Sequence, residues 1–190
     1  MMRPAVFVDR DGTLIDERGY LDRLDLLHVF PWTPDALRLL NRAGFAVVVI
    51  TNQSAIGRGI IDQAFLRQVH DELDRRLALG GARIDAYYFC PHHPEAEIEQ
   101  YRQVCRCRKP GPGMIEQACR DLQLDPARSV MVGDRWLDVA AGNAAGARSV
   151  LVRTGHGGHE ADHPLDGVRA DAILNNLMEA TGWILRTSSR

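Results

Sequence analysis

Two acidic side chains follow an apolar run near the start of the sequence. The run Ala5–Asp9 ends in the first of them, and Asp11 stands two positions later, directly before Gly12. Because glycine lets the backbone bend, both carboxylates can face one cleft at the end of a strand. Such a pair can bind a divalent cation or divide the roles of nucleophile and acid/base. The same residues also fit an Asx turn, so the pair alone does not decide between chemistry and a turn.

Groups with related chemistry stand at three other predicted strand or helix ends. They are Thr51-Asn52-Gln53-Ser54, Arg108-Lys109-Pro110 and Val132-Gly133-Asp134, with Asp138 one helical turn later. Lys109 is the one lysine among the 23 lysine and arginine residues. Carboxylates, an ammonium and a hydroxyl in one site favour phosphoryl transfer to water, because the charge of the phosphate must be neutralised before a carboxylate can attack it. A Mg²⁺ ion held by Asp9 and Asp134, with Lys109 opposite, would supply that charge.

Short β-branched runs alternating with helical patterns must position these groups. Strands are predicted at Ala5–Asp9, Phe45–Ile50, Ala86–Phe89, Ser129–Gly133, Ser149–Val152 and Asp171–Leu174. Helices are predicted at Thr33–Ala43, around Phe65–Leu77, and at Pro112–Leu122, Trp136–Ala145 and Asn175–Ile184. The stretches 14–32, 90–109 and 154–167 have no predicted element. This order favours an α/β fold, a three-layer sandwich around a mainly parallel sheet that binds ligands at the carboxyl ends of its strands.

Thiols and imidazoles gather in the loop before Lys109. Their types and spacing suit a Cys₃His zinc site within residues 90–107, made of Cys90, His92, Cys105 and Cys107. Four protein ligands leave no open position, so this Zn²⁺ would be structural and would order the loop that ends at Lys109. His93 could replace His92 as the ligand, and buried cysteines without a metal are the alternative interpretation.

Composition excludes several classes of protein. Of the 190 residues, 45% are hydrophobic and 25% charged, an ordinary globular balance that predicts one domain, 1–190. The formal net charge is −2, so no basic field indicates nucleic acid or an anionic membrane as a partner. No apolar run is long enough to span a bilayer, and four cysteines are too few for a disulfide framework. We expect a cytoplasmic monomer.

The motifs DRDGT, TNQS, RKP and GDRWLD occur in this order between positions 9 and 138. They resemble the motifs of phosphatases of the haloacid dehalogenase superfamily, which have a Rossmann-like core. The resemblance implies that Asp9 is a nucleophile that forms an aspartyl-phosphate, and that Asp11 is the general acid and base. It also implies that Thr51 and Lys109 hold the phosphoryl group. Mg²⁺ would be bound by Asp9, Asp134 and the backbone carbonyl of Asp11.

The spacing of the motifs leaves no room for a separate cap domain, so we expect an open site. Substrate contacts are expected from Arg18, Gly19, Tyr20, Leu21, Thr51, Asn52, Gln53, Ser54 and Arg108. Arg10 lies between two catalytic carboxylates, and the alternation of side chains along a strand predicts that it points away from the cleft.

The pattern C-x-H…C-x-C-R-K-P is similar to two capless subgroups of the superfamily, the heptose bisphosphate phosphatases and the histidinol-phosphate phosphatases. The residues around Gly19 and the segment Lys109–Met114 resemble the first subgroup. That resemblance implies a small sugar bisphosphate as substrate and a bacterial, cytoplasmic role in making activated heptose for lipopolysaccharide. The alternatives are a histidinol-phosphate phosphatase and a non-catalytic binding module that keeps the zinc loop.

Overall fold

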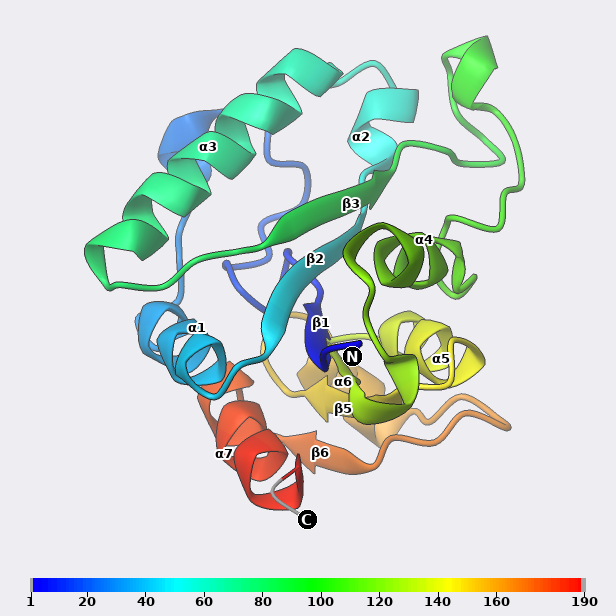
Figure 1. Ribbon diagram of the computed structural model, residues 1–190. Helices are drawn as coiled ribbons and strands as arrows, with labels where there is room; N and C mark the ends of the chain where they lie inside the picture. Colours follow the sequence, from blue (N-terminus) through cyan, green and yellow to red (C-terminus); the bar gives the residue numbers. More distant parts are fainter. Residues whose placement is uncertain (1, 189–190) are drawn as a thin grey trace.

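The computed structural model describes residues 2–188. Its centre is a six-stranded parallel sheet with strand order β3-β2-β1-β4-β5-β6. The strands are β1 (Ala5–Val8), β2 (Ala46–Asn52), β3 (Ala86–Cys90), β4 (Val130–Gly133), β5 (Arg148–Val152) and β6 (Ala172–Leu174). The helices are α1 (Thr33–Arg42), α2 (Ser54–Gly57), α3 (Gln63–Leu79), α4 (Gly113–Leu122), α5 (Trp136–Ala144), α6 (Gly157–Asp162) and α7 (Leu177–Ser188). The arrangement confirms the predicted α/β sandwich (Figure 1).

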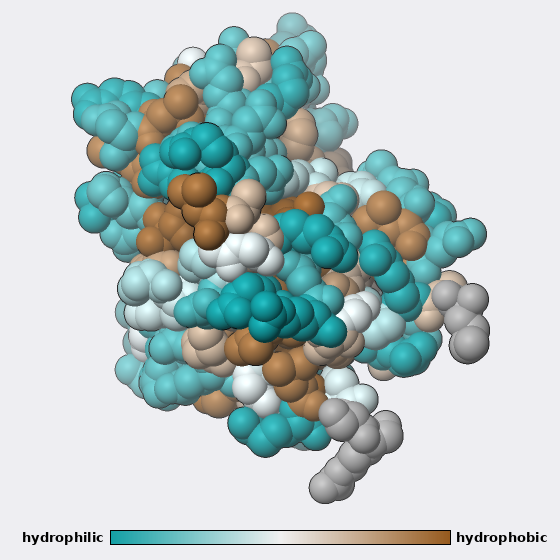
Figure 2. Space-filling model, turned by 60° about the vertical axis from the view of Figure 1, so that its left-hand side comes forward, coloured by the Kyte–Doolittle hydropathy of each residue, from teal (hydrophilic) through white to brown (hydrophobic). Residues whose placement is uncertain are grey.

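The central strands are buried on both faces, which explains their continuous runs of β-branched residues. Alternate side chains of β1 enter two different cores. Val6 and Val8 pack with α1, α3 and α7, whereas Ala5 and Phe7 pack with α4 and α5. Helices therefore cover both faces of the sheet, as Figure 1 shows. On the outer face seen in Figure 2, hydrophilic residues surround small apolar patches.

The register of the sheet aligns the strand ends that carry the chemistry. Val8 pairs with Val49 of β2 on one side and with Val132 of β4 on the other. The chain leaves β1 at Asp9 and β4 at Asp134, so these two carboxylates emerge from neighbouring strands at the same edge. The site is therefore assembled by the parallel register of β1, β2 and β4.

The predicted strands and helices occur, and most of their ends are shifted by no more than two residues. Two short α-helices, α2 and α6, were not predicted. α6 lies in the stretch 154–167, for which no element was predicted. Its carboxylate Glu160 accepts a hydrogen bond from the backbone N–H of Trp136 (2.9 Å), and its backbone carbonyl accepts one from the indole (2.7 Å). Because these contacts come from another part of the chain, the local Gly- and His-rich sequence did not reveal the helix. None of the described helices is long and apolar enough to cross a membrane.

Candidate active site

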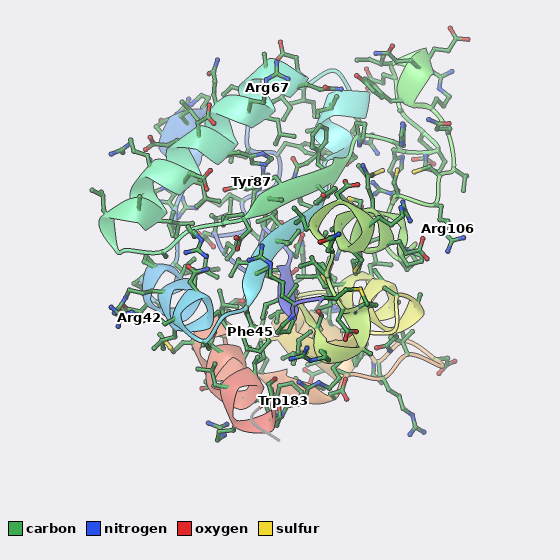
Figure 3. All side chains as sticks on the ribbon, viewed as in Figure 1. Arg42, Phe45, Arg67, Tyr87, Arg106 and Trp183 are labelled. Carbon is green, nitrogen blue, oxygen red and sulfur yellow. The ribbon has the colours of Figure 1, made fainter. Side chains whose placement is uncertain are left out.

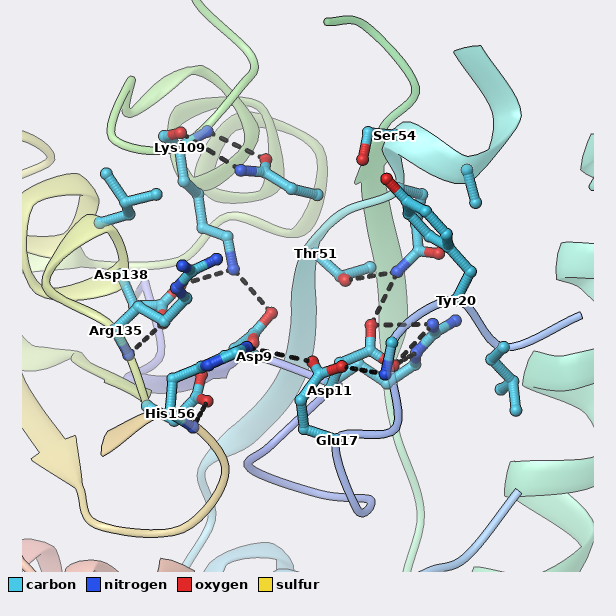
Figure 4. A pocket seen from close by; sticks show the side chains of 18 of the residues that line it. Asp9, Asp11, Glu17, Tyr20, Thr51, Ser54, Lys109, Arg135, Asp138 and His156 are labelled. Carbon is cyan, nitrogen blue, oxygen red and sulfur yellow. Dashed lines mark hydrogen bonds and ion pairs between the residues drawn. The ribbon is translucent and has the colours of Figure 1, made fainter. Parts of the chain in front are cut away.

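A cavity of about 260 Å³ opens at the carboxyl ends of β1, β2 and β4. Most of the residues predicted for the site line it: Asp9, Asp11, Gly19, Tyr20, Leu21, Thr51, Asn52, Gln53, Ser54, Arg108, Lys109 and Asp134. Side chains from these separate segments point toward one another across the cavity (Figure 4). The structure therefore brings together groups that lie up to 125 positions apart in the sequence, between Asp9 and Asp134.

Lys109 is a buried cation of this cleft. Its Nζ lies 2.6 Å from Oδ1 of Asp9, 2.6 Å from Oδ1 of Asp138 and 2.9 Å from the carbonyl oxygen of Ile50. Burial alone would lower the pKa of Lys109, but Asp138 and Asp9 raise it above its usual range. The ammonium is therefore charged at neutral pH and stands beside the carboxylate that the family resemblance makes the nucleophile.

Three buried carboxylates, Asp9, Asp134 and Asp138, can each offer an oxygen within 4.8 Å of the others. Burial and the neighbouring carboxylates together raise the pKa of Asp9 to about 7 and that of Asp134 to about 9, although Lys109 lowers both. Oδ1 of Asp134 is buried and has no hydrogen-bond partner among the described residues. A divalent cation would satisfy this oxygen and favour the ionised carboxylates, so the cluster fits Mg²⁺.

Two glycines pack directly against the carboxylate of Asp134. Oδ2 of Asp134 accepts a hydrogen bond from the backbone N–H of His156 at 2.7 Å. Gly12 and Gly155 both have positive φ, +80° and +56°, and a Cβ on either one would overlap Asp134. The loop after β5 thereby turns the carboxylate so that only Oδ1 is left for a cation. The sequence analysis did not assign this loop to the site.

Asp11 is held from two sides. Arg10, which is 2% exposed, pairs with both of its oxygens through Nη2 at 2.8 Å, and Nε2 of Gln53 donates to Oδ2 at 2.9 Å. The same Gln53 nitrogen donates to the hydroxyl oxygen of Thr51 at 2.8 Å. Arg10, predicted to point away from the cleft, borders the cavity, and its guanidinium is buried and paired with Asp11.

The structure does not place every predicted substrate contact in the cleft. Arg18 is absent from the lining and donates instead to Asp16 at 2.8 Å, where half of its side chain is exposed. Arg108 lines the cleft and donates from Nη1 to the carbonyl of His92 at 3.1 Å. Sequence analysis noted Asp138 in the GDRWLD motif without giving it a role in the site. Five further lining residues were not predicted: Glu17, Ala55, Arg135, Leu137 and His156.

The predicted zinc ligands gather beside β3. The ligand atoms of Cys90, His92, Cys105 and Cys107 all lie within 4.8 Å of one another, with Nδ1 of His92 3.3 Å from Sγ of Cys107. His93 does not join them, since its Nδ1 accepts a hydrogen bond from the backbone N–H of Glu95. A compact group of three thiols and one imidazole fits a tetrahedral Zn²⁺. Arg106, between two of the ligands, pairs with Glu116 of α4 and ties the loop to that helix (Figure 3).

Comparison with known proteins gives consistent matches. The profile of a family described as HAD-hydrolase-like matches residues 106–180. The D-glycero-beta-D-manno-heptose-1,7-bisphosphate 7-phosphatase of Escherichia coli (strain K12) is 43% identical over 177 residues, which cover 93% of this chain and 91% of that protein. The protein of the same name from Haemophilus ducreyi is 40% identical and covers 97% of this chain and 100% of its own length.

A solved structure agrees with these relatives. The D,D-heptose 1,7-bisphosphate phosphatase of B. bronchiseptica, in complex with magnesium and phosphate, superimposes with a TM-score of 0.86 at 31% identity, covering 97% of this chain and 99% of that one. The fold and the strand-end carboxylates define a hydrolase of the haloacid dehalogenase type. Within that class, the chain belongs to the family of heptose 1,7-bisphosphate phosphatases.

Proposed function

We propose that this protein is a Mg²⁺-dependent phosphatase that removes the 7-phosphate of D-glycero-D-manno-heptose 1,7-bisphosphate and releases heptose 1-phosphate. The observation that carries the proposal is the buried carboxylate of Asp9, which pairs with Lys109 and belongs to the carboxylate cluster with Asp134 and Asp138. The family supports the substrate, because the relatives named above are heptose bisphosphate 7-phosphatases. Their names specify the β anomer, which we therefore propose for this chain.

In the proposed reaction, a carboxylate oxygen of Asp9 attacks phosphorus, and the bond to O7 of the sugar breaks. Asp11 gives its proton to the departing oxygen, and an aspartyl-phosphate remains on Asp9. Asp11, now ionised, takes a proton from water as the water attacks phosphorus, which releases phosphate and restores both aspartates. Lys109 and the hydroxyl of Thr51 bind the phosphoryl oxygens during both steps.

Mg²⁺ would be held by Asp9, Asp134 and the backbone carbonyl of Asp11. When bound, it places positive charge on the phosphoryl oxygens. Asp138 belongs to the same carboxylate cluster, but its Oδ1 is 2.6 Å from Lys109 and its Oδ2 accepts from the backbone N–H of Arg135 at 3.0 Å. We therefore assign Asp138 to the support of Lys109.

The other residues of the cleft would bind the sugar and its second phosphate or hold the catalytic groups. Gly19–Leu21 and Ser54 would contact the sugar, Gln53 would hold Asp11, and Arg108 would bind the second phosphate at the cleft edge as a fork. We propose a single domain over 1–190 that acts as a monomer on a small molecule in the cytoplasm, where phosphorylated sugars are made. Zn²⁺ would be structural and bound by the four ligands of the loop at 90–107.

The test is phosphate release from the α and β heptose 1,7-bisphosphates and from histidinol phosphate, measured side by side with Mg²⁺. We expect rapid release from the β bisphosphate and loss of that release in Asp9→Asn. Preference for histidinol phosphate would move the protein to the other subgroup without changing the mechanism. No release from any of the three by the Mg²⁺- and Zn²⁺-loaded protein would favour a non-catalytic binding module.

A further inference from the structure

The carboxamide of Asn52 is paired with the backbone of Lys109. Asn52 is the last residue of β2; its Oδ1 accepts from the N–H of Lys109 at 3.0 Å, and its Nδ2 donates to the carbonyl of the same residue at 3.2 Å. The two residues are 57 positions apart. Asn52 therefore satisfies both backbone polar groups of Lys109, much as a neighbouring strand would.

Lys109 needs such support because its own segment has no regular structure. It lies between the zinc loop and α4, where the chain is held by turns such as the one from Gly111 N–H to the carbonyl of Arg108 (2.7 Å). The ammonium is carried on a four-carbon stem, so its position depends on where the backbone is fixed. β2 fixes that backbone through Asn52 and also receives the ammonium itself, at the carbonyl of Ile50.

We propose that Asn52 is a positioning residue that acts on the reaction through Lys109, by setting the distance of the ammonium from Asp9. The inference rests on the proposed function, since it matters only if Lys109 holds the transferred phosphoryl group. A displaced ammonium weakens the stabilisation of the transition state more than the binding of the substrate. The reason is that the ammonium stabilises the negative charge on the phosphoryl oxygens only from a fixed position.

The chain contains a matched control for this arrangement. Asn41, near the end of α1, holds the backbone of Arg83 in the same way: Oδ1 accepts from its N–H at 3.0 Å, and Nδ2 donates to its carbonyl at 3.2 Å. Neither residue lines the cavity. Asn41→Ala therefore removes the same pair of hydrogen bonds without touching the proposed chemistry.

The experiment compares Asn52→Ala, Asn41→Ala, Lys109→Met and the double variant Asn52→Ala/Lys109→Met. We expect Asn52→Ala to lower kcat/KM by about 10-fold to 100-fold, mostly through kcat, and to weaken inhibition by orthovanadate, a mimic of the phosphoryl transition state, by a similar factor. Asn41→Ala should keep wild-type kcat/KM. In the Lys109→Met background, removal of Asn52 should have no further effect on either quantity, since the ammonium it positions is gone.

Equal losses from Asn52→Ala in both backgrounds would overturn the inference, because Asn52 would then act on the substrate directly. Wild-type kinetics in Asn52→Ala would overturn it as well. Wild-type activity in Lys109→Met would instead contradict the proposed function. If Asn52→Ala does not fold, Asn52→Ser, whose hydroxyl is too short to reach Lys109, takes its place in the same comparison.

Discussion

Arg10 and Asp11 are neighbours in the chain, and their side chains form a partly buried fork. Nη2 of Arg10 lies 2.8 Å from each oxygen of Asp11, and Nε lies 3.1 Å from Oδ1. A planar guanidinium can make this contact, whereas an ammonium cannot reproduce it. The proposed acid/base is thus oriented by the residue that precedes it in the chain.

Replacement of this fork should impair proton transfer. Arg10→Lys is expected to lower kcat/KM for the sugar bisphosphate by about 10-fold to 100-fold, because Asp11 loses its fixed orientation. The loss should be smaller for p-nitrophenyl phosphate, whose leaving group departs without a proton. Steady-state kinetics on both substrates give the comparison. An equal loss on the two would contradict a role in proton transfer; Arg38→Lys, at a surface pair with Asp35, is the control.

Gly155 should be needed for metal binding. In Gly155→Ala, the added Cβ overlaps Asp134, and the alanine must also adopt a φ of +56°. We expect the Mg²⁺ concentration for half-maximal activity to rise about tenfold or more, with destabilisation of about 1–3 kcal/mol. Gly146→Ala carries similar strain at φ +80° but meets no atom within 4 Å. Unchanged Mg²⁺ dependence in Gly155→Ala, or an equal change in Gly146→Ala, would contradict this account of Asp134.

Removal of zinc should impair substrate binding as well as stability. Cys107→Ser is expected to lose the bound metal, to lower the melting temperature and to raise KM, because the loop that leads to Arg108 and Lys109 loses its anchor. Cys119→Ser, in α4 and outside the cluster, is the matched control. Zinc content, melting temperature and KM are measured on the same samples. A zinc-free variant with wild-type KM would show that the metal does not order the cleft.

His70 should make stability depend on pH. Its ring is stacked on that of Tyr87, the β3 residue labelled in Figure 3, and burial lowers the pKa of His70 from 6.5 to about 3. Below pH 6.5 the unfolded chain binds a proton that the folded protein does not, so stability is complete above pH 6.5 and falls as the pH decreases toward 3. The limiting slope is about 1.4 kcal/mol per pH unit.

His70→Phe, which keeps an aromatic ring beside Tyr87, should remove this part of the pH dependence. Urea unfolding of both proteins at pH 7.5, 6.5 and 5.5 gives the difference in unfolding free energy. We expect the unfolding free energy of the variant to rise relative to that of the wild type as the pH falls, since the other titrating groups are common to both proteins. A difference that stays constant over this range would mean that His70 does not account for the loss.

Most of the regular elements, and the chemical groups at their ends, can be predicted from local sequence. The β-branched runs around Val6, Val48 and Val132 predict buried parallel strands from local composition alone, and parallel strands end at one edge. Asp9, Thr51 and Asp134 were therefore predicted to meet there. The order of the motifs and the spacing of the zinc ligands also gave the family correctly, because these features are local in the chain.

The orientation of each side chain beyond a strand end depends instead on contacts made in the folded protein. The directions of Arg10 and Arg18, the choice of His92 over His93 and the pairing of Asn52 with Lys109 depend on partners brought in from elsewhere. For the same reason, Glu160 of α6 reaches Trp136 and the backbone N–H of His156 reaches Asp134. Beyond a strand end no periodicity constrains a side chain, so its orientation is set by the hydrogen bonds and charges it meets in the folded protein.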